Sequence, residues 1–337
     1  MSRIPNRVKI VLAALAIAVL GALSPISPLG PAQSGGSEGQ PPPAGQVCRP
    51  TRTMTLYAEV VGDGFGYGRT PSTASIPGPT IEMREGQCLA ITLVNHLADD
   101  VSIHTHGLDY TVESDGTPLS ESCTPPGGRR TYVFGAHAPT QRDDRTTAPG
   151  SAGYWHYHDH CMGTDHGTTG VNSGLFGALI VRRPGDPLPD RPPFVVVMVQ
   201  DSINLKYAPN TPVFEANVGE RVEFVVIGHG DLFHTFHLHA HRWADTRTGL
   251  LATIQDSSPV IDDKTLGPGD SFGFQVIAGE RVGPGAWMYH CHVQEHSDGG
   301  MSGIFMVRDA GGRVTAAGEA TLAAWRAAHA GMTHEGH

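Results

Sequence analysis

Short apolar runs separated by turn residues cover the chain from about residue 50 to residue 310. Each run is rich in β-branched or aromatic residues and is bounded by Gly, Pro, Asn or Asp, which is typical of strands in sandwiches and barrels. The pattern predicts strands at residues 89–94, 132–134, 179–181, 194–199, 222–227, 272–277 and 304–307. A helical pattern stands out only at residues 319–330. The sequence therefore predicts an all-β fold with a short C-terminal helical tail.

A Pro-rich break and an internal repeat divide the apolar region into two halves. The break is PGDPLPDRPP at residues 184–193. On either side of it, residues 79–86 resemble residues 212–219, and WHYHDH at 155–160 resembles WMYHCH at 287–292. Because the matches keep the same order in both halves, we infer a tandem duplication of one β domain. The predicted domains are residues 48–184 and 194–310, followed by a tail at 311–337.

The N-terminus has the pattern of an export signal. Three basic residues precede an apolar run at residues 10–23, which is shorter than a membrane span. We therefore expect a signal peptide at residues 1–33, with an uncleaved anchor as the alternative, and a flexible Pro/Gly/Ser-rich spacer at residues 34–47. The expected location is secreted or extracytoplasmic. Five cysteines fit an oxidising compartment, and the pairing among Cys48, Cys88, Cys123 and Cys161 stays open.

Charge and composition narrow the function. The net charge is -10 and no block of Lys and Arg stands out, which argues against nucleic-acid binding. No stable membrane association is expected of the processed chain. Against this background the 19 histidines are unusual because they cluster.

The clustered histidines form four His-x-His pairs at equivalent places in the two halves. On a strand, residues i and i+2 point to the same face, so each pair presents two imidazoles side by side. Eight imidazoles suit copper or another borderline metal, whereas they exceed the needs of a four-coordinate zinc site. The pairs are His104/His106, His158/His160, His237/His239 and His290/His292.

The second half adds a thiol to its imidazoles. Cys291 is followed by His296 and Met301, and His234 lies three residues before His237. One thiolate, two imidazoles and a distant thioether are the ligand set of a blue copper electron-transfer centre. In the first half, Asp159 stands at the position of Cys291, so only the second half is predicted to hold such a centre.

The motifs resemble those of the multicopper oxidases, and specifically of the bacterial two-domain small laccases. They are HTHG at 104–107, HYHDH at 156–160, HTFHLHAH at 234–241 and HCHVQEHSDGGM at 290–301. The resemblance implies two tandem cupredoxin-like Greek-key β-barrels and four coppers per chain. It assigns His234, Cys291, His296 and axial Met301 to type 1 copper, His104 and His237 to type 2 copper, and His106, His158, His160, His239, His290 and His292 to the type 3 pair. His156 and His241 are expected to be supporting or surface groups rather than ligands.

The resemblance also implies an activity and an assembly. The expected reaction is four one-electron oxidations of phenols or aromatic amines coupled to reduction of O2 to water. A homotrimer would share each trinuclear site between neighbouring chains. Asp115 would assist proton delivery, with a solvated turn aspartate as the alternative, and Tyr110 would be a redox relay.

Other functions stay open at this point. They are a two-domain copper nitrite reductase, a cuprous (metal-ion) oxidase, and a copper-binding or electron-carrier protein without enzymatic activity. The three tail histidines, His329, His334 and His337, are expected to lie in a disordered terminus rather than in a metal site.

Overall fold

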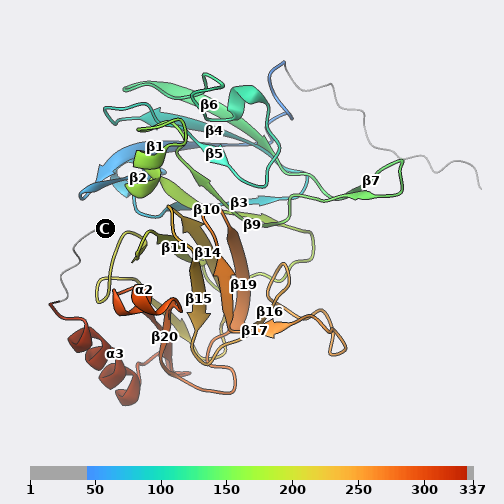
Figure 1. Cartoon of the computed structure of the whole chain (residues 1–337). Coiled ribbons are helices and arrows are strands. Elements are labelled where there is room, and N and C mark those ends of the chain that lie inside the picture. Colours follow the sequence, from blue (N-terminus) through green and yellow to red (C-terminus); the bar gives the residue numbers. More distant parts are fainter. Residues whose placement is uncertain (1–43, 332–337) are drawn as a thin grey trace, which may run out of the picture. The chain divides into compact units, whose positions relative to one another are not determined.

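The computed structural model describes residues 44–331, and its first half forms two four-stranded sheets around one core (Figure 1). The first sheet has the strand order β2-β1-β4-β6 and the second β3-β10-β9-β5. The bounds are β1 Arg52–Val61, β2 Gly64–Gly68, β3 Gly78–Arg84, β4 Cys88–Asn95, β5 His104–Thr105, β6 Arg129–Gly135, β9 Gly153–His158 and β10 Phe176–Arg182. Buried side chains from both sheets, such as Leu56 and Leu179, pack in the same cluster.

The second half repeats this arrangement. Its sheets have the orders β12-β11-β14-β19 and β13-β21-β20-β15-β18. The bounds are β11 Phe194–Val199, β12 Ser202–Ile203, β13 Val213–Asn217, β14 Arg221–His229, β15 His234–Leu238, β18 Asp263–Leu266, β19 Ser271–Ile277, β20 Gly285–Cys291 and β21 Ser302–Arg308. β1 and β4 are parallel, as are β11 and β14, and β3 and β10 are parallel, as are β13 and β21. The repeated strand order supports the inferred duplication and confirms the all-β prediction.

Small elements complete the described part of the chain. They are the hairpins β7 Thr140–Gln141 with β8 Thr147–Ala148 and β16 Trp243–Ala244 with β17 Val260–Ile261, the 3₁₀ turns Pro71–Thr73 and Val112–Ser114, and the helices α1 Thr168–Asn172, α2 Gln294–Asp298 and α3 Ala316–Ala328. None of the helices within residues 44–331 is long and apolar enough to cross a membrane. The expected signal peptide lies outside the described residues.

The C-terminal helix packs on the second half of the chain. The Thr315 side chain caps α3 by accepting a hydrogen bond from the amide of Gly318. Trp325 is buried, and its indole N–H donates to Ser302 Oγ at 3.2 Å. His329 follows the helix, and its Nδ1 donates to the carbonyl of Trp325 at 2.7 Å. The expectation of a disordered terminus is therefore wrong for His329, because Trp325 anchors the helix; His334 and His337 lie outside the described residues.

All seven predicted strands are present. The packing of the two halves against each other explains why one of them, β10, consists almost entirely of apolar residues. β10 is buried at all seven positions because it packs on both faces. Leu179 and Val181 face the first core, whereas Ala178 and Ile180 pack against strands of the second half, including Val197 and Val225. A strand buried on both faces loses the alternation of apolar and polar residues.

A buried carboxylate also joins the two halves. Glu223 on β14 is fully buried and accepts hydrogen bonds from Arg182 on β10 at 2.8 and 3.0 Å. Tyr154 Oη and Gln275 Nε2 donate to the same carboxylate at 2.7 and 2.9 Å. Four donors therefore compensate the charge of Glu223 inside the interface.

Replacing Glu223 with Gln should lower the free energy of unfolding by about 3 kcal/mol, because the buried Arg182 loses its main counter-charge. Arg313→Ala is the control, since Arg313 pairs with Asp309 on the surface and such pairs contribute about 0–1 kcal/mol. Denaturant unfolding of both variants measures the difference. Equal losses would show that the Glu223 charge does not hold the interface together.

Candidate metal centre

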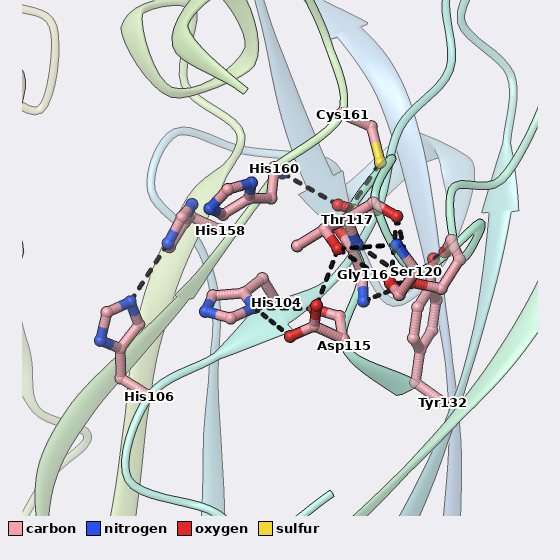
Figure 2. Close-up of polar contacts among 12 residues, drawn as sticks. His104, His106, Asp115, Gly116, Thr117, Ser120, Tyr132, His158, His160 and Cys161 are labelled. Atoms are coloured by element: carbon pink, nitrogen blue, oxygen red, sulfur yellow. Dashed lines mark hydrogen bonds and ion pairs between the residues drawn. The ribbon is translucent and has the colours of Figure 1, made fainter. Parts of the chain in front are cut away.

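Four histidines of the first half lie together at the end of the strand pair β5–β9. His104 is directly opposite His158 in the strand register. The ring of His160 lies 5.0 Å from that of His104, and Nε2 of His106 lies 3.2 Å from Nε2 of His158. Ligand atoms of His104, His106 and His158 all lie within 4.8 Å of one another. We call these four residues the first histidine group (Figure 2).

Local packing fixes the backbone of this group. Gly107, which ends the HTHG motif, has a φ of 74°. A Cβ there would lie 2.2 Å from the ring of Trp155, so only glycine fits. Asp159, between two of the histidines, is buried and accepts hydrogen bonds from the amides of Ser102 at 2.7 Å and Met162 at 2.8 Å. Burial raises the pKa of Asp159 to about 6, opposed by these backbone hydrogen bonds.

The second histidine group consists of His237, His239, His290 and His292. His237 on β15 is opposite His290 on β20, which repeats the register of the first group. Ligand atoms of His237, His239 and His290 lie within 4.8 Å of one another, and the ring of His292 lies 5.3 Å from that of His290. His292 is exposed, so this group lies nearer the surface than the first.

The two histidine groups are separate within one chain. In residues 44–331, no hydrogen bond or ring contact joins a member of the first group to a member of the second. The first group instead contacts His229, at the end of β14, whose ring lies 5.2 Å from that of His158. The structure therefore gathers each set of four predicted ligands but does not bring the two sets together.

A third set of donors surrounds Cys291. Its Sγ lies 3.8 Å from Nδ1 of His234 and 3.6 Å from Nδ1 of His296. Met301 is buried in the same core cluster as Cys291. α2 bridges the short segment between Cys291 and Met301 and carries His296. The predicted type 1 ligands are thus close together, and we call His234, Cys291, His296 and Met301 the thiol site.

The two imidazoles of the thiol site differ in exposure. His234 is fully buried, and its Nε2 has no hydrogen-bond partner. His296 is only partly buried. Burial lowers the pKa of His234 to about 4, and the neighbouring His296 adds to this shift. Burial also raises the pKa of the Cys291 thiol. His296 is therefore the ligand whose edge lies nearer to solvent.

The donor chemistry of all three sets fits a metal ion. Burial lowers the pKa of His104, and it lowers that of His106 to about 4. The pKa values of His239 and His290 are lowered for the same reason. Neutral imidazoles keep the lone pair that a metal needs. At these four histidines, burial therefore favours the neutral ring, in which one nitrogen keeps a lone pair for a metal.

Asp115 and Tyr110 lie beside the first group, as the resemblance implies. Nδ1 of His104 donates to the carbonyl oxygen of Asp115 at 2.7 Å and lies 3.7 Å from the Asp115 carboxylate. The Tyr110 ring is 5.9 Å from that of His104. Burial raises the pKa of Tyr110, and the neighbouring Asp115 carboxylate adds to the effect. The backbone carbonyl of Asp115 therefore orients the His104 ring, and the Asp115 carboxylate lies close to the first histidine group.

His156 and His241 are buried, so of the two expected roles, supporting or surface group, the structure favours the supporting one for both. His156 stacks on His106 with ring centroids 3.9 Å apart, and its Nε2 donates to the carbonyl of Gly269 at 3.1 Å. His241 Nε2 accepts from the amide of Gly279, so its Nδ1–H donates to the carbonyl of His239. Both residues support predicted ligands.

His229 is the member of the site that the sequence did not reveal. It comes from the second half of the chain, yet it lines a cavity of about 430 Å³ together with the first histidine group. It has no partner two residues away, so it forms no His-x-His pair. Its proximity to His158 arises only from the packing of the two halves.

Two tandem β-sandwiches with three separate sets of imidazole and thiol donors define a two-domain cupredoxin-like metal protein. Two family models, both described as multicopper oxidase, match residues 72–186 and 187–311. The chain belongs to the multicopper oxidase family, which implies a copper-dependent oxidoreductase.

The similar proteins include laccases and a probable nitrite reductase fusion protein. A probable nitrite reductase-hydroxylamine oxidoreductase fusion protein of Kuenenia stuttgartiensis is 34% identical over 277 residues, which is 75% of this chain and 30% of the relative. Laccase-1 of Cryptococcus neoformans is 35% identical over 144 residues, 41% of this chain and 20% of the relative. The chain thus spans a third or less of the length of these relatives.

Solved structures share the fold. The blue copper oxidase from Nitrosomonas europaea has a TM-score of 0.56 at 24% identity and covers 77% of this chain and 86% of its own. The copper nitrite reductase from Nitrosomonas europaea has a TM-score of 0.57 at 19% identity and covers 77% and 94%. At this identity the likeness shows the cupredoxin fold, in agreement with the sequence prediction.

Substitution of Cys291 with Ser should abolish the blue colour of the copper-loaded protein, because the thiolate is the donor that gives such centres their colour. Circular dichroism should show an unchanged fold. Met301→Leu is the matched control in the same core; it removes only the weak axial donor and should leave the protein blue. Visible spectra of the two variants decide the matter. A blue Cys291→Ser protein would remove this sulfur from the site.

Proposed function

We propose that the protein is a laccase-type oxidase that takes single electrons from phenols or aromatic amines and reduces O2 to water. The observation that carries the proposal is the position of Cys291. Its neighbours in the chain, His290 and His292, belong to the second histidine group, so a few covalent bonds link the thiol site to that group. Bound copper would supply the one-electron chemistry and the site of O2 reduction.

The chain's own residues would divide the remaining tasks. His296 would receive the electron from the donor, because it is partly exposed whereas His234 is fully buried. Asp115, whose carboxylate lies 3.7 Å from Nδ1 of His104, would assist proton delivery to the first histidine group. Tyr110 would serve as a redox relay beside His104.

We further propose a homotrimer in which each trinuclear site is shared. The first and second histidine groups lie apart within one chain, and the second group includes the exposed His292. A head-to-tail ring of three chains would bring the first group of one chain to the second group of the next. Such an assembly would give eight imidazoles per site, as the type 2 and type 3 assignments require.

Location outside the cytoplasm is proposed as well. Two disulfides, Cys48–Cys88 and Cys123–Cys161, are present, and they leave Cys291 free for the thiol site. Disulfides of this kind persist in oxidising compartments. Cys48 thus pairs with Cys88, and Cys123 pairs with Cys161, among the four cysteines whose pairing the sequence left open.

Nitrite reduction is the second candidate because of the names of the Kuenenia relative and the Nitrosomonas structure. Two-domain copper nitrite reductases need fewer histidines and hold their thiolate copper in the first domain, whereas Cys291 lies in the second. A cuprous oxidase has weaker support, since the chain contains only 9 methionines and no Met-rich insertion. A simple electron carrier would have no use for two additional histidine groups.

Copper analysis combined with substrate assays tests the proposed function. We expect four coppers per chain, one of them blue by visible and EPR spectroscopy. Oxygen uptake should depend on an added phenol, and nitrite should not replace O2 as the acceptor. Two coppers per chain together with nitrite-dependent turnover would favour the second candidate instead.

Complementation between two inactive variants tests the shared site. His106→Ala disables the first histidine group and His292→Ala the second, so each protein alone should consume no oxygen. When the two chains are co-expressed in equal amounts, about a quarter of the shared sites should be intact if the chains mix at random. Mixed oligomers that stay inactive would place each site within a single chain.

A further inference from the structure

Two loops of the first sandwich meet beside the first histidine group. One loop, residues 114–124, carries Asp115, and the other follows β9 and carries His160. Asp115 and His160 line the same cavity, of about 470 Å³. The distance between the predicted ligand His160 and the Asp115 carboxylate therefore depends on the relative position of the two loops.

A disulfide joins these loops directly at the site. Cys161 follows His160 in the chain and is bonded to Cys123, with the two Cα atoms 6.0 Å apart. Sγ of Cys161 also lies 3.5 Å from the carbonyl oxygen of Gly116, the residue after Asp115 (Figure 2). The disulfide is thus adjacent in the chain to His160 and in contact with Gly116, the residue next to Asp115.

Hydrogen bonds relay the position of Cys123 to Asp115. Ser122, next to Cys123, accepts hydrogen bonds at its Oγ from the amides of Gly116 at 2.7 Å and Thr117 at 3.0 Å. Thr117 Oγ1 in turn donates to the Asp115 carboxylate at 2.7 Å. This chain of contacts is short and largely buried, so a shift of Cys123 is passed to the carboxylate.

The other end of the bridge is held near the metal ligands. The amide of His160 donates to Ser102 Oγ at 2.9 Å, and the amide of Cys161 donates to Asp159 at 3.2 Å. Gly116 has a φ of 74°, and a Cβ there would lie 2.5 Å from the carbonyl oxygen of Ile103, the residue before His104. The 114–124 loop therefore packs tightly against the backbone that leads into the first histidine group.

We propose that Cys123 and Cys161 are positioning residues for the trinuclear half-site: their bridge fixes His160 relative to Asp115 and His104. The proposal rests on the proposed function in that the first histidine group binds copper. The second sandwich lacks this bridge: Val293 stands at the position of Cys161, and α2, which carries His296, follows directly there.

The chain contains a matched control for this proposal. The second disulfide, Cys48–Cys88, closes a loop of 40 residues, compared with 38 for Cys123–Cys161. The loss of chain-entropy stabilisation on removing either bridge should therefore be similar. Cys48 and Cys88 pack with Ala90 and Val133, and Cys88 is the first residue of β4, so neither cysteine is a chain neighbour of the first histidine group. Only positioning should distinguish the two bridges.

The experiment compares Cys123→Ser/Cys161→Ser with Cys48→Ser/Cys88→Ser. Both should lower the unfolding temperature by similar amounts and keep the blue band of the thiol site. Only the first should weaken binding of added copper(II) at the trinuclear site, by about tenfold or more, as loss of supporting contacts around metal ligands does. In the copper-free proteins, hydrogen exchange of amides 114–122 should accelerate only in the first variant.

The outcomes separate this proposal from the proposed function. Equal copper affinity and equal exchange in both variants would overturn the positioning role. Absence of trinuclear copper from the wild type would defeat the proposed function, while the exchange rates would still decide whether the bridge orders the Asp115 loop. If the serine variant does not fold, Cys123→Ala/Cys161→Val, which copies Val293, replaces it. Failure of both to fold, with the Cys48/Cys88 control folded, would make the bridge a folding requirement and also overturn the proposal.

Discussion

The register of two strand pairs is the constraint on which the sites depend. His104 faces His158, and His237 faces His290. The second histidine of each His-x-His pair lies just beyond the end of its strand, so each strand pair gathers four imidazoles at one edge. A slip of one residue would turn the imidazoles to the opposite face. Tyr157 and Tyr289 oppose such a slip: each is fully buried, and their hydroxyls donate to the carbonyls of Pro79 and Pro212 at 2.8 and 2.7 Å.

The residue between the two histidines of the pairs His158/His160 and His290/His292 differs between the two sandwiches. In the first sandwich it is Asp159, which accepts backbone hydrogen bonds and only holds its neighbours in place. In the second it is Cys291, whose sulfur faces two imidazoles. The carboxylate accepts hydrogen bonds from the amides of Ser102 and Met162, whereas the sulfur lies within 3.8 Å of a nitrogen atom of each of two imidazoles. Divergence at this position explains why only the second sandwich carries a thiol among its metal-ligating donors.

The sequence alone predicted the features that depend on the spacing of residues along a single strand. Apolar runs located the strands, and His-x-His spacing located both histidine groups, because side-chain direction follows directly from the strand period. His229 and the Glu223–Arg182 pair could not be found in this way. Both depend on packing between the two sandwiches, which leaves no periodic signal. The disulfide pairing escaped for a different reason: both bridges lie within the first sandwich, but four cysteines allow three connectivities that spacing alone does not distinguish.

The unequal burial of the two histidine groups connects the fold with the proposed assembly. The first group is covered from one side by the chain's own second sandwich, through His229 and the Gly269 carbonyl that His156 contacts. The second group is more open within residues 44–331, because it includes the exposed His292. Reduction of O2 needs a site closed to bulk water, because charges are stabilised more strongly in a dry, preorganised pocket. A neighbouring chain that covers the second group would supply the missing wall together with the missing ligands, so closure of the site and completion of its donor set would occur in one step.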